Sequence, residues 1–428
     1  MIRRLFQARL FRAGMLLVAS SALGQGIVMA AMPLLTRMYS PEDFGVLAVF
    51  TSVLSIVCVI ASLRLEVAIP LPAKEGEAAN VAMLATLFVG ITTPIVALLT
   101  WLFAEPLMEL TDTTRLRPYL WLLPFGFAAI GLYEVLNYWA LRQQAFGTIA
   151  RTKLAQGFGS AIVMVGFGIL SLGSALGLML GQVFGKAAGV TSLAAQAWRD
   201  GRHLLVQVNG ATLWASLRRY ARFPLLGSWS ALINSAGGQL PGILIASLWG
   251  VDVAGWYGLV QLVLVGPVAL VINGIRQVFF AEVSRLRTAD PKGMLPLFRT
   301  TGLRMLLVGV APTLAVMAIG PWASALVFGE QWRSAGVYMQ ILAPMVLLSS
   351  ISAPLSIAMS AVERQDLQLG WDVLRLAVVF LCFGVALKFD LGPFDGMVLY
   401  SIGMTLTYLV LHAMTWRALR TAANDGPQ

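Results

Sequence analysis

Long apolar stretches alternate with short polar connections along the whole chain. Crossing the hydrocarbon layer of a membrane, about 30 Å thick, takes about 20 apolar residues. The longest connection, 196–222, is too short to hold a separate soluble domain. The pattern therefore predicts an all-α integral membrane protein with about twelve transmembrane helices: 14–35, 44–63, 79–103, 119–141, 154–172, 175–195, 223–248, 256–280, 303–323, 335–361, 374–391 and 396–416.

The basic residues fall mainly on alternate connections. Of the 30 Lys and Arg residues, 21 lie on the connections of one face and five on those of the other. Short connections rich in Lys and Arg stay in the cytoplasm. We therefore expect both termini to be cytoplasmic. The same asymmetry accounts for the net charge of +10, so we expect no nucleic-acid partner.

The connection 196–222 is the longest and most basic, and it divides the spans six and six. We expect an N-lobe (1–195), a basic cytoplasmic linker (196–222), a C-lobe (223–416) and a cytoplasmic tail (417–428). A weak match between 38–47 and 251–260 indicates two parallel repeats. Such repeats are typical of transporters that handle their substrate between the two halves, which here predicts a central lumen.

Residues for catalysis are scarce. The chain has two histidines, His203 in a basic connection and His412 near the end of the last span. Its two cysteines, Cys58 and Cys382, lie inside spans, where packing is their expected role. The pattern offers no acid–base pair, no nucleophile with its base and no metal-ligand cluster. We expect a protein that is not an enzyme and that uses no metal or cofactor.

Charged residues inside the spans are the main candidates for function, because they are costly in a membrane and normally face the bundle interior. Lys186 in the sixth span, with Gln182 one turn before it, is expected to face a lumen. In the eighth span Asn273 and Arg276 share a polar stripe, although Arg276 is close enough to the interface to reach it instead. Arg304 and Arg375 lie nearer their span ends and are interpreted as topology anchors.

Glu134 lies well inside the fourth span, with Asn137 and Tyr138 on the same helical face. It is either a proton-carrying group for energy coupling or a partner for Lys186 or Arg276, with polar packing as a third interpretation. Arg64 and Glu66 close the second span. Their i, i+2 spacing places them on different helical faces, so we expect them to pair with other helices.

A cationic membrane interior requires an anionic ligand. Arginine binds phosphate oxygens through forked hydrogen bonds, and lysine acts as a point charge. A lipid diphosphate carrying sugars fits this chemistry, as do organic anions and anionic drugs.

Two segments carry a family resemblance: 33–45, with the sequence PLLTRMYSPEDFG, and 64–72, with the sequence RLEVAIPLP. They resemble the opening of bacterial O-antigen and capsule repeat-unit flippases of the multidrug/oligosaccharidyl-lipid/polysaccharide exporter superfamily. The resemblance implies a cationic lumen, alternating access and a role for Arg64 and Glu66 in substrate binding.

The function implied is translocation of undecaprenyl-diphosphate-linked oligosaccharide from the cytoplasmic to the periplasmic leaflet of the bacterial inner membrane. The implied partners are this lipid-linked oligosaccharide, membrane lipids, a polymerase and other polysaccharide-assembly proteins, and we expect the protein to be a monomer. The alternatives are a cation-coupled multidrug exporter of the same superfamily and a membrane glycosyltransferase or polymerase.

Overall fold

The computed structural model describes residues 2–111, 114–170 and 174–425, without the side chains of 2–13, 107, 109–111, 114–115, 205–207 and 425. Every element in this part of the chain is helical. The chain forms two compact units, unit 1 (Met1–Gly255) and unit 2 (Trp256–Gln428). The predicted division into lobes around the linker 196–222 stays a prediction, and the last three residues of the predicted tail lie outside the described residues.

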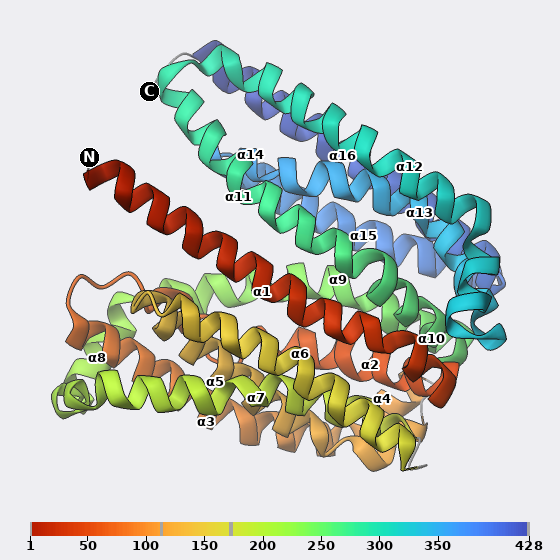
Figure 1. Cartoon of the computed structure of the whole chain (residues 1–428), viewed down its shortest axis with the longest axis horizontal. Helices are drawn as coiled ribbons and strands as arrows, with labels where there is room; N and C mark the ends of the chain where they lie inside the picture. The colour runs from red at the N-terminus through yellow and green to blue at the C-terminus, as the bar shows by residue number, and fades with distance from the viewer. Residues whose placement is uncertain (1, 112–113, 171–173, 426–428) are drawn as a thin grey trace. The chain divides into compact units, whose positions relative to one another are not determined.

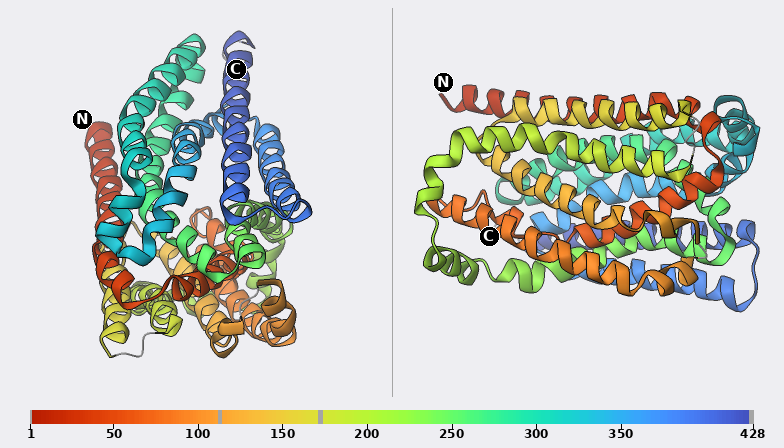
Figure 2. Two further views of the ribbon diagram at one scale, coloured as in Figure 1. Left: turned by 90° about the vertical axis from the view of Figure 1, so that its right-hand side faces the viewer. Right: turned by 90° about the horizontal axis from the view of Figure 1, so that it is seen from below.

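The helices of unit 1 run side by side (Figures 1 and 2). They are α1 (Ile2–Met38), α2 (Pro41–Cys58), η1 (Leu65–Ala68), α3 (Glu75–Leu102), α4 (Ala104–Thr111), η2 (Thr114–Tyr119), α5 (Leu122–Arg142), α6 (Phe146–Ile169), α7 (Ala175–Gly201), η3 (Arg202–Gln207), α8 (Gly210–Arg219), η4 (Phe223–Gly227) and α9 (Ser228–Trp249). Helix α10 (Val251–Val260) begins in unit 1 and ends in unit 2.

Unit 2 continues with η5 (Gln261–Val265), α11 (Gly266–Ala289), η6 (Pro291–Gly293), α12 (Met294–Phe328), η7 (Glu330–Trp332), α13 (Arg333–Leu355), α14 (Ile357–Ala361), α15 (Gln365–Lys388) and α16 (Pro393–Asp425). Helix α13 packs against α12 and α16, and α15 packs against α16. The buried core includes Val283, Phe298, Leu355 and Leu411. The wider π-helical turn η5 ends just before Pro267, which lacks the backbone N–H that a regular helix needs.

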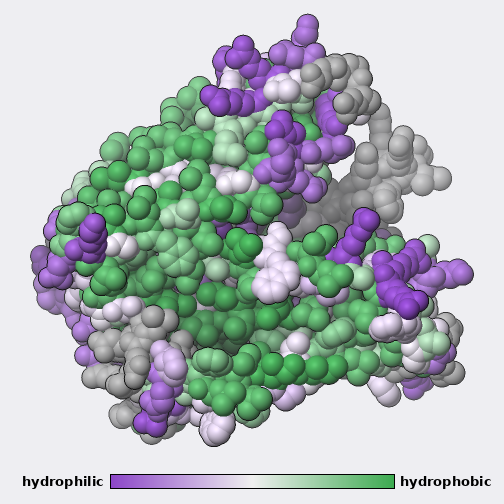
Figure 3. Space-filling model, turned by 180° about the vertical axis from the view of Figure 1, so that it is seen from behind, coloured by the Kyte–Doolittle hydropathy of each residue, from purple (hydrophilic) through white to green (hydrophobic). Residues whose placement is uncertain are grey.

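Eleven helices in the described part of the chain are long and apolar enough to cross a membrane. Hydrophobic side chains cover most of the face in Figure 3, and hydrophilic side chains gather toward its margins. Helix α5 is not among the eleven although it has 21 residues, because Glu134, Asn137 and Tyr138 reduce its hydropathy. The predicted all-helical membrane fold is confirmed.

The turn between α1 and α2 illustrates how local sequence shapes the fold. Ser40 caps α2: its hydroxyl accepts from the backbone N–H of Asp43, whose carboxylate accepts from the Ser40 N–H. Tyr39 is buried and donates to the carbonyl of Met164 at 2.8 Å, which fixes this turn against α6. Burial and the nearby Asp43 raise the pKa of Tyr39 to about 12, so it remains a donor.

Candidate functional site: a charged cluster in unit 1

The second span ends earlier than predicted. Helix α2 stops at Cys58 rather than residue 63, and the chain passes through turns into η1. Leu63 and Arg64 adopt left-handed backbone conformations, with φ of 52° and 62°. Such conformations cost about 1–2 kcal/mol for residues other than glycine, and they persist where surrounding contacts hold them. Here Thr92 of α3 donates to the carbonyl of Ala61 at 2.8 Å.

This break brings Arg64 and Glu66 together. Arg64 Nη1 lies 3.4 Å from Glu66 Oε1, and the Ser62 hydroxyl donates to the other carboxylate oxygen of Glu66. The prediction that the two residues pair only with other helices is therefore wrong, since the segment is not α-helical and the i, i+2 argument does not apply to it. Glu66 is buried, whereas the Arg64 side chain keeps 35% of its surface exposed. Arg64 can therefore also meet a ligand.

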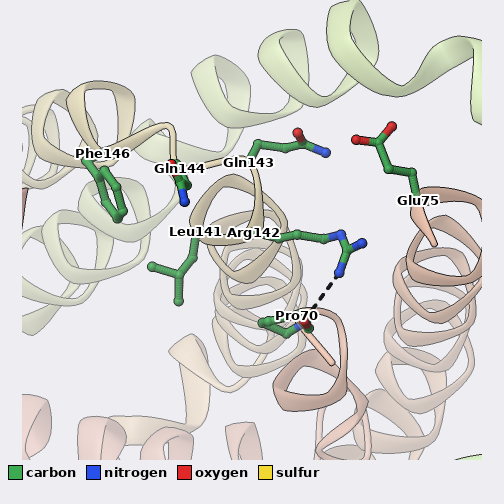
Figure 4. A pocket seen from close by; sticks show the side chains of 7 residues that line it. All are labelled: Pro70, Glu75, Leu141, Arg142, Gln143, Gln144 and Phe146. Carbon is green, nitrogen blue, oxygen red and sulfur yellow. Dashed lines mark hydrogen bonds between the residues drawn. The ribbon is translucent and has the colours of Figure 1, made fainter. Parts of the chain in front are cut away.

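Arg142, the last residue of α5, holds the loop that follows η1. Its Nη1 donates to the carbonyls of Ile69, Pro70 and Pro72 at 3.4, 3.2 and 2.7 Å. It lines a pocket of about 430 Å³, and Figure 4 shows its side chain reaching Pro70, with Glu75 of α3 on the far side. Because two of the three acceptors belong to prolines, this loop has few donors of its own, and Arg142 supplies them.

Glu134 lies in a cluster of charges from four elements. Its carboxylate interacts electrostatically with Lys153 of α6, with Lys186 of α7 and with Glu66 and Arg64. Of the three interpretations of Glu134, the partner role therefore has Lys153 as well as Lys186 as candidates. Lys186 is exposed on α7, one turn after the half-buried Gln182. Both lysines interact with the same carboxylate and also repel each other.

Lys153 is the member of this cluster that the sequence analysis missed. The hydropathy pattern places Lys153 on the connection between the predicted spans 119–141 and 154–172, whereas α6 begins at Phe146 and carries it within the helix. Its ammonium group lies 5.0 Å from the centre of the Tyr133 ring, one residue before Glu134. A lysine seven residues inside an apolar helix is the signal that could have identified it.

Neutral polar groups border the charges. Tyr138, one turn after Glu134, interacts electrostatically with Glu134, Glu66 and Arg64. Gln156 donates to the backbone carbonyl of Lys186 at 3.4 Å. Among the described residues, the side-chain oxygen of Asn137 is buried without a hydrogen-bond partner. A buried acceptor of this kind costs about 1–3 kcal/mol, and water or a ligand hydroxyl would satisfy it.

Asn273 and Arg276 are placed in unit 2, where both are exposed on α11. The structure thus brings together Arg64, Glu66, Glu134 and Lys186, with Gln182 on the same helix as Lys186. Asn273 and Arg276 remain candidates because they share a polar stripe within an apolar span.

Unit 2 contains a polar group of its own that the sequence analysis did not predict. Arg375 was interpreted as a topology anchor, but its side chain is only 12% exposed and lies 3.8 Å from Asp372. Its guanidinium also lies 4.9 Å from the Trp371 ring centre. Arg375 therefore has partners within unit 2 and its role as a topology anchor stays a prediction; the i, i+3 spacing of the acid and the base was the signal for this pair.

Residues 34–336 match the model of a family described as polysaccharide biosynthesis protein, which is more than half of the chain. The chain belongs to this family. The resemblance found in its opening segments is confirmed.

Two curated relatives of this polysaccharide biosynthesis protein are transport or biosynthesis proteins. The lipopolysaccharide biosynthesis protein WzxC of Escherichia coli K12 is 22% identical over 395 residues, covering 90% of this chain and 77% of WzxC. The succinoglycan biosynthesis transport protein ExoT of Rhizobium meliloti is 25% identical over 341 residues, covering 74% of this chain and 62% of ExoT.

Solved structures identify the fold. A multidrug resistance transporter of the MATE family in the MOP superfamily, in an inward-facing conformation, aligns with a TM-score of 0.71 at 14% identity, covering 94% of this chain and 96% of that one. A MOP superfamily transporter from Pyrococcus furiosus aligns with a TM-score of 0.63 at 15% identity, covering 96% and 95%. This member of the polysaccharide biosynthesis family has the MATE-like transporter fold.

Proposed function

We propose that this protein is a flippase that carries undecaprenyl-diphosphate-linked oligosaccharide from the cytoplasmic to the periplasmic leaflet of the bacterial inner membrane. The observation that carries the proposal is the cluster of Arg64, Lys153 and Lys186 around Glu66 and Glu134 in a membrane-spanning unit. Family membership and the names of the two relatives support a role in polysaccharide transport.

The cluster fits an anionic cargo. Three cations face two carboxylates, so one positive charge is left for a ligand to balance. Charges at membrane depth cost several kcal/mol each unless they are paired or hydrated, so an unbalanced cation is costly without a binding role. A diphosphate joined to a lipid and a sugar carries two negative charges, which match the cluster when Glu134 is protonated and the formal charge of the cluster is +2. A cationic drug would add a further positive charge, and the multidrug exporter alternative is therefore disfavoured.

Each residue has a distinct proposed role. Arg64, partly exposed at the end of the broken second span, would bind phosphate oxygens through its forked donors. Lys153 and Lys186 would act as point charges on the same group. Gln182 and the unsatisfied oxygen of Asn137 would meet sugar hydroxyls. The lipid tail would stay in the bilayer while alternating access carries the polar headgroup across.

Energy coupling is proposed to involve Glu134, the carboxylate that interacts with both lysines. A proton on Glu134 would remove its negative charge and leave the lysines free to hold the diphosphate. Loss of the proton would restore a competing carboxylate and weaken the hold on the diphosphate. Substrate affinity would thus depend on the protonation state of one named group, Glu134.

The orientation proposed places both termini, the linker and the Arg142 pocket on the cytoplasmic side. Cysteine labelling in intact cells tests it, with Cys58 and Cys382 replaced first. Gly201 is buried against Trp139, so the exposed His203 is the position to label on the cytoplasmic side. Asp395, which is also exposed, is the position to label on the periplasmic side. Labelling of His203→Cys by an impermeant reagent from outside would contradict the orientation.

Deletion of the gene in its native bacterium tests the function. We expect loss of the surface or secreted polysaccharide, accumulation of lipid-linked oligosaccharide in the membrane, and rescue by the wild-type gene but not by Lys186→Ala. Normal polysaccharide and no accumulated precursor in the deletion strain would reject the flippase proposal.

A further inference from the structure

Unit 1 contains a second hollow, at the other end of the α3–α5 pair from the Arg142 pocket. Glu75 and Arg142 line the first pocket, whereas Trp101 and Trp121 line the second. At 1.5 Å per residue, Glu75 and Trp101 at the two ends of helix α3 are about 40 Å apart along its axis, the thickness of a bilayer with its headgroups. The second hollow therefore lies at headgroup depth on the opposite membrane face.

The lining of this second hollow, the groove between α3 and α5, suits a lipid chain. It has a volume of about 800 Å³, and Thr93, Ala97, Thr100 and Ala128 form a lining of small residues. Larger aromatic side chains of the same groove remain accessible from outside the protein. They are Trp101, Trp121 and Phe125, which are 76%, 54% and 64% exposed.

The exposed aromatic side chains place the groove at the surface that lipid covers. Trp121 and Phe125 pack edge to face with ring centres 5.8 Å apart. Tryptophan is enriched at the level of lipid headgroups. A volume of several hundred Å³ takes one flexible apolar chain or a drug-sized molecule.

The charged residues that line the groove form one ion pair. Arg117 of η2 lies 2.8 Å from Glu105 of α4, and the two side chains are 69% and 63% exposed. An exposed pair of this kind contributes between about zero and 1 kcal/mol, so a ligand can separate its members at little cost. The groove thus offers a cation for a phosphate and, next to it, a carboxylate for an ammonium group.

We propose that this groove binds phosphatidylethanolamine, with an acyl chain between α3 and α5, its phosphate on Arg117 and its primary ammonium on Glu105. The headgroup carries the two charges that complement the pair. Phosphatidylglycerol and polyprenyl phosphate offer no cation to Glu105, and phosphatidylcholine offers no N–H donor. This site is separate from the charged cluster and does not depend on the proposed transport activity.

The experiment measures lipid binding to the full-length, delipidated protein by native mass spectrometry. The probes are phosphatidylethanolamine, phosphatidylglycerol and phosphatidylcholine with identical acyl chains, and polyprenyl phosphate. We expect the ethanolamine lipid to bind up to about fivefold more tightly than the other three, because an exposed ion pair contributes at most about 1 kcal/mol. Equal binding of phosphatidylglycerol, or stronger binding of polyprenyl phosphate, would overturn the proposal.

Variants separate the headgroup contacts from the groove. Glu105→Gln should remove the preference for ethanolamine while chain binding remains, and Ala97→Phe should weaken all four lipids by filling the groove. The matched control is Glu330→Gln, which breaks an equally exposed Glu–Arg pair in unit 2, with Arg333 at 2.6 Å. Unchanged selectivity in Glu105→Gln, or loss of selectivity in Glu330→Gln, would overturn the assignment of this site.

Discussion

Gly45 and Gly255 bring the first turns of α2 and α10 into reciprocal contact. A Cβ atom on Gly45 would lie 1.9 Å from the carbonyl oxygen of Val251, and one on Gly255 would lie 1.8 Å from the carbonyl oxygen of Pro41. Each glycine therefore meets the carbonyl four residues before the other glycine. These two contacts pair residues 41–45 with residues 251–255. The weak sequence match pairs 38–47 with 251–260, so the two alignments differ by three residues.

We expect Gly45→Ala and Gly255→Ala each to destabilise the protein by about 1–3 kcal/mol, because the methyl group must displace a backbone carbonyl. The matched control is Gly90→Ala in α3, where nothing lies within 4 Å of the added atom. Thermal unfolding of the detergent-solubilised proteins measures the effect. If Gly45→Ala and Gly255→Ala both unfold at the wild-type temperature, α2 and α10 do not pack this closely.

Arg142 is expected to position Arg64 and Glu66 through the loop that it holds. Arg142→Gln removes the charged donor to the three carbonyls and should destabilise the loop by about 1–2 kcal/mol. Hydrogen exchange in residues 65–73 should accelerate and polysaccharide export should fall, with Arg142→Lys intermediate in both. The exposed Arg151→Gln on α6 is the control. If hydrogen exchange accelerates in Arg142→Gln but polysaccharide export is unchanged, Arg142 stabilises the loop and does not position Arg64 and Glu66 for transport.

Lys153 and Lys186 are expected to act on the same ligand. Lys153→Ala and Lys186→Ala should each reduce export at least tenfold, since an interaction of a charged group worth 1.4 kcal/mol or more is lost. Protein levels should remain near those of the wild type, and Lys186→Arg should be milder because it keeps the charge. Lys292→Ala, in the short helix η6, is the control. Export at wild-type levels in both alanine variants would exclude the pair from the binding site.

Glu134→Gln distinguishes coupling from structural pairing. If the carboxylate carries a proton, the glutamine fixes its neutral form, so substrate should still bind while turnover stops. Glu134→Asp should keep part of the activity. If Glu134 is only a partner of the lysines, Glu134→Gln should lower stability, and combining it with Lys153→Met should restore stability, because the cost comes from an uncompensated charge. Proton flux in proteoliposomes is the deciding measurement, and wild-type flux in Glu134→Gln would exclude coupling.

The membrane fold could be predicted because length and hydropathy are local properties of each span. The end of α2 could not, because Val59, Ile60 and Ala61 are as apolar as the helix before them. The left-handed turn at Leu63 and Arg64 lies between two contacts from residues distant in sequence: Thr92 binds the carbonyl of Ala61 before it, and Arg142 binds that of Pro72 after it. Hydropathy contains no information about these contacts.

The candidate site was predicted in part for a similar reason. Lys186 and Glu134 lie within apolar stretches, so the cost of placing a charge inside a membrane span identified both. Lys153 lies where an apolar stretch begins, and only the packing of α5 and α6 shows that it interacts with Glu134. The pairing of Arg64 with Glu66 likewise required the 3₁₀ geometry of η1.

Transport in a purified system tests the central claim most directly. Proteoliposomes would contain this protein and an undecaprenyl-diphosphate-linked oligosaccharide with a labelled sugar, and an impermeant sugar-modifying enzyme would report exposure at the outer leaflet. The flippase account predicts that the wild type moves the oligosaccharide of the inner leaflet to the outer leaflet rapidly. Lys186→Ala should move it no faster than protein-free vesicles do. Equal rates in wild-type and protein-free vesicles across both imposed proton-gradient directions would contradict it.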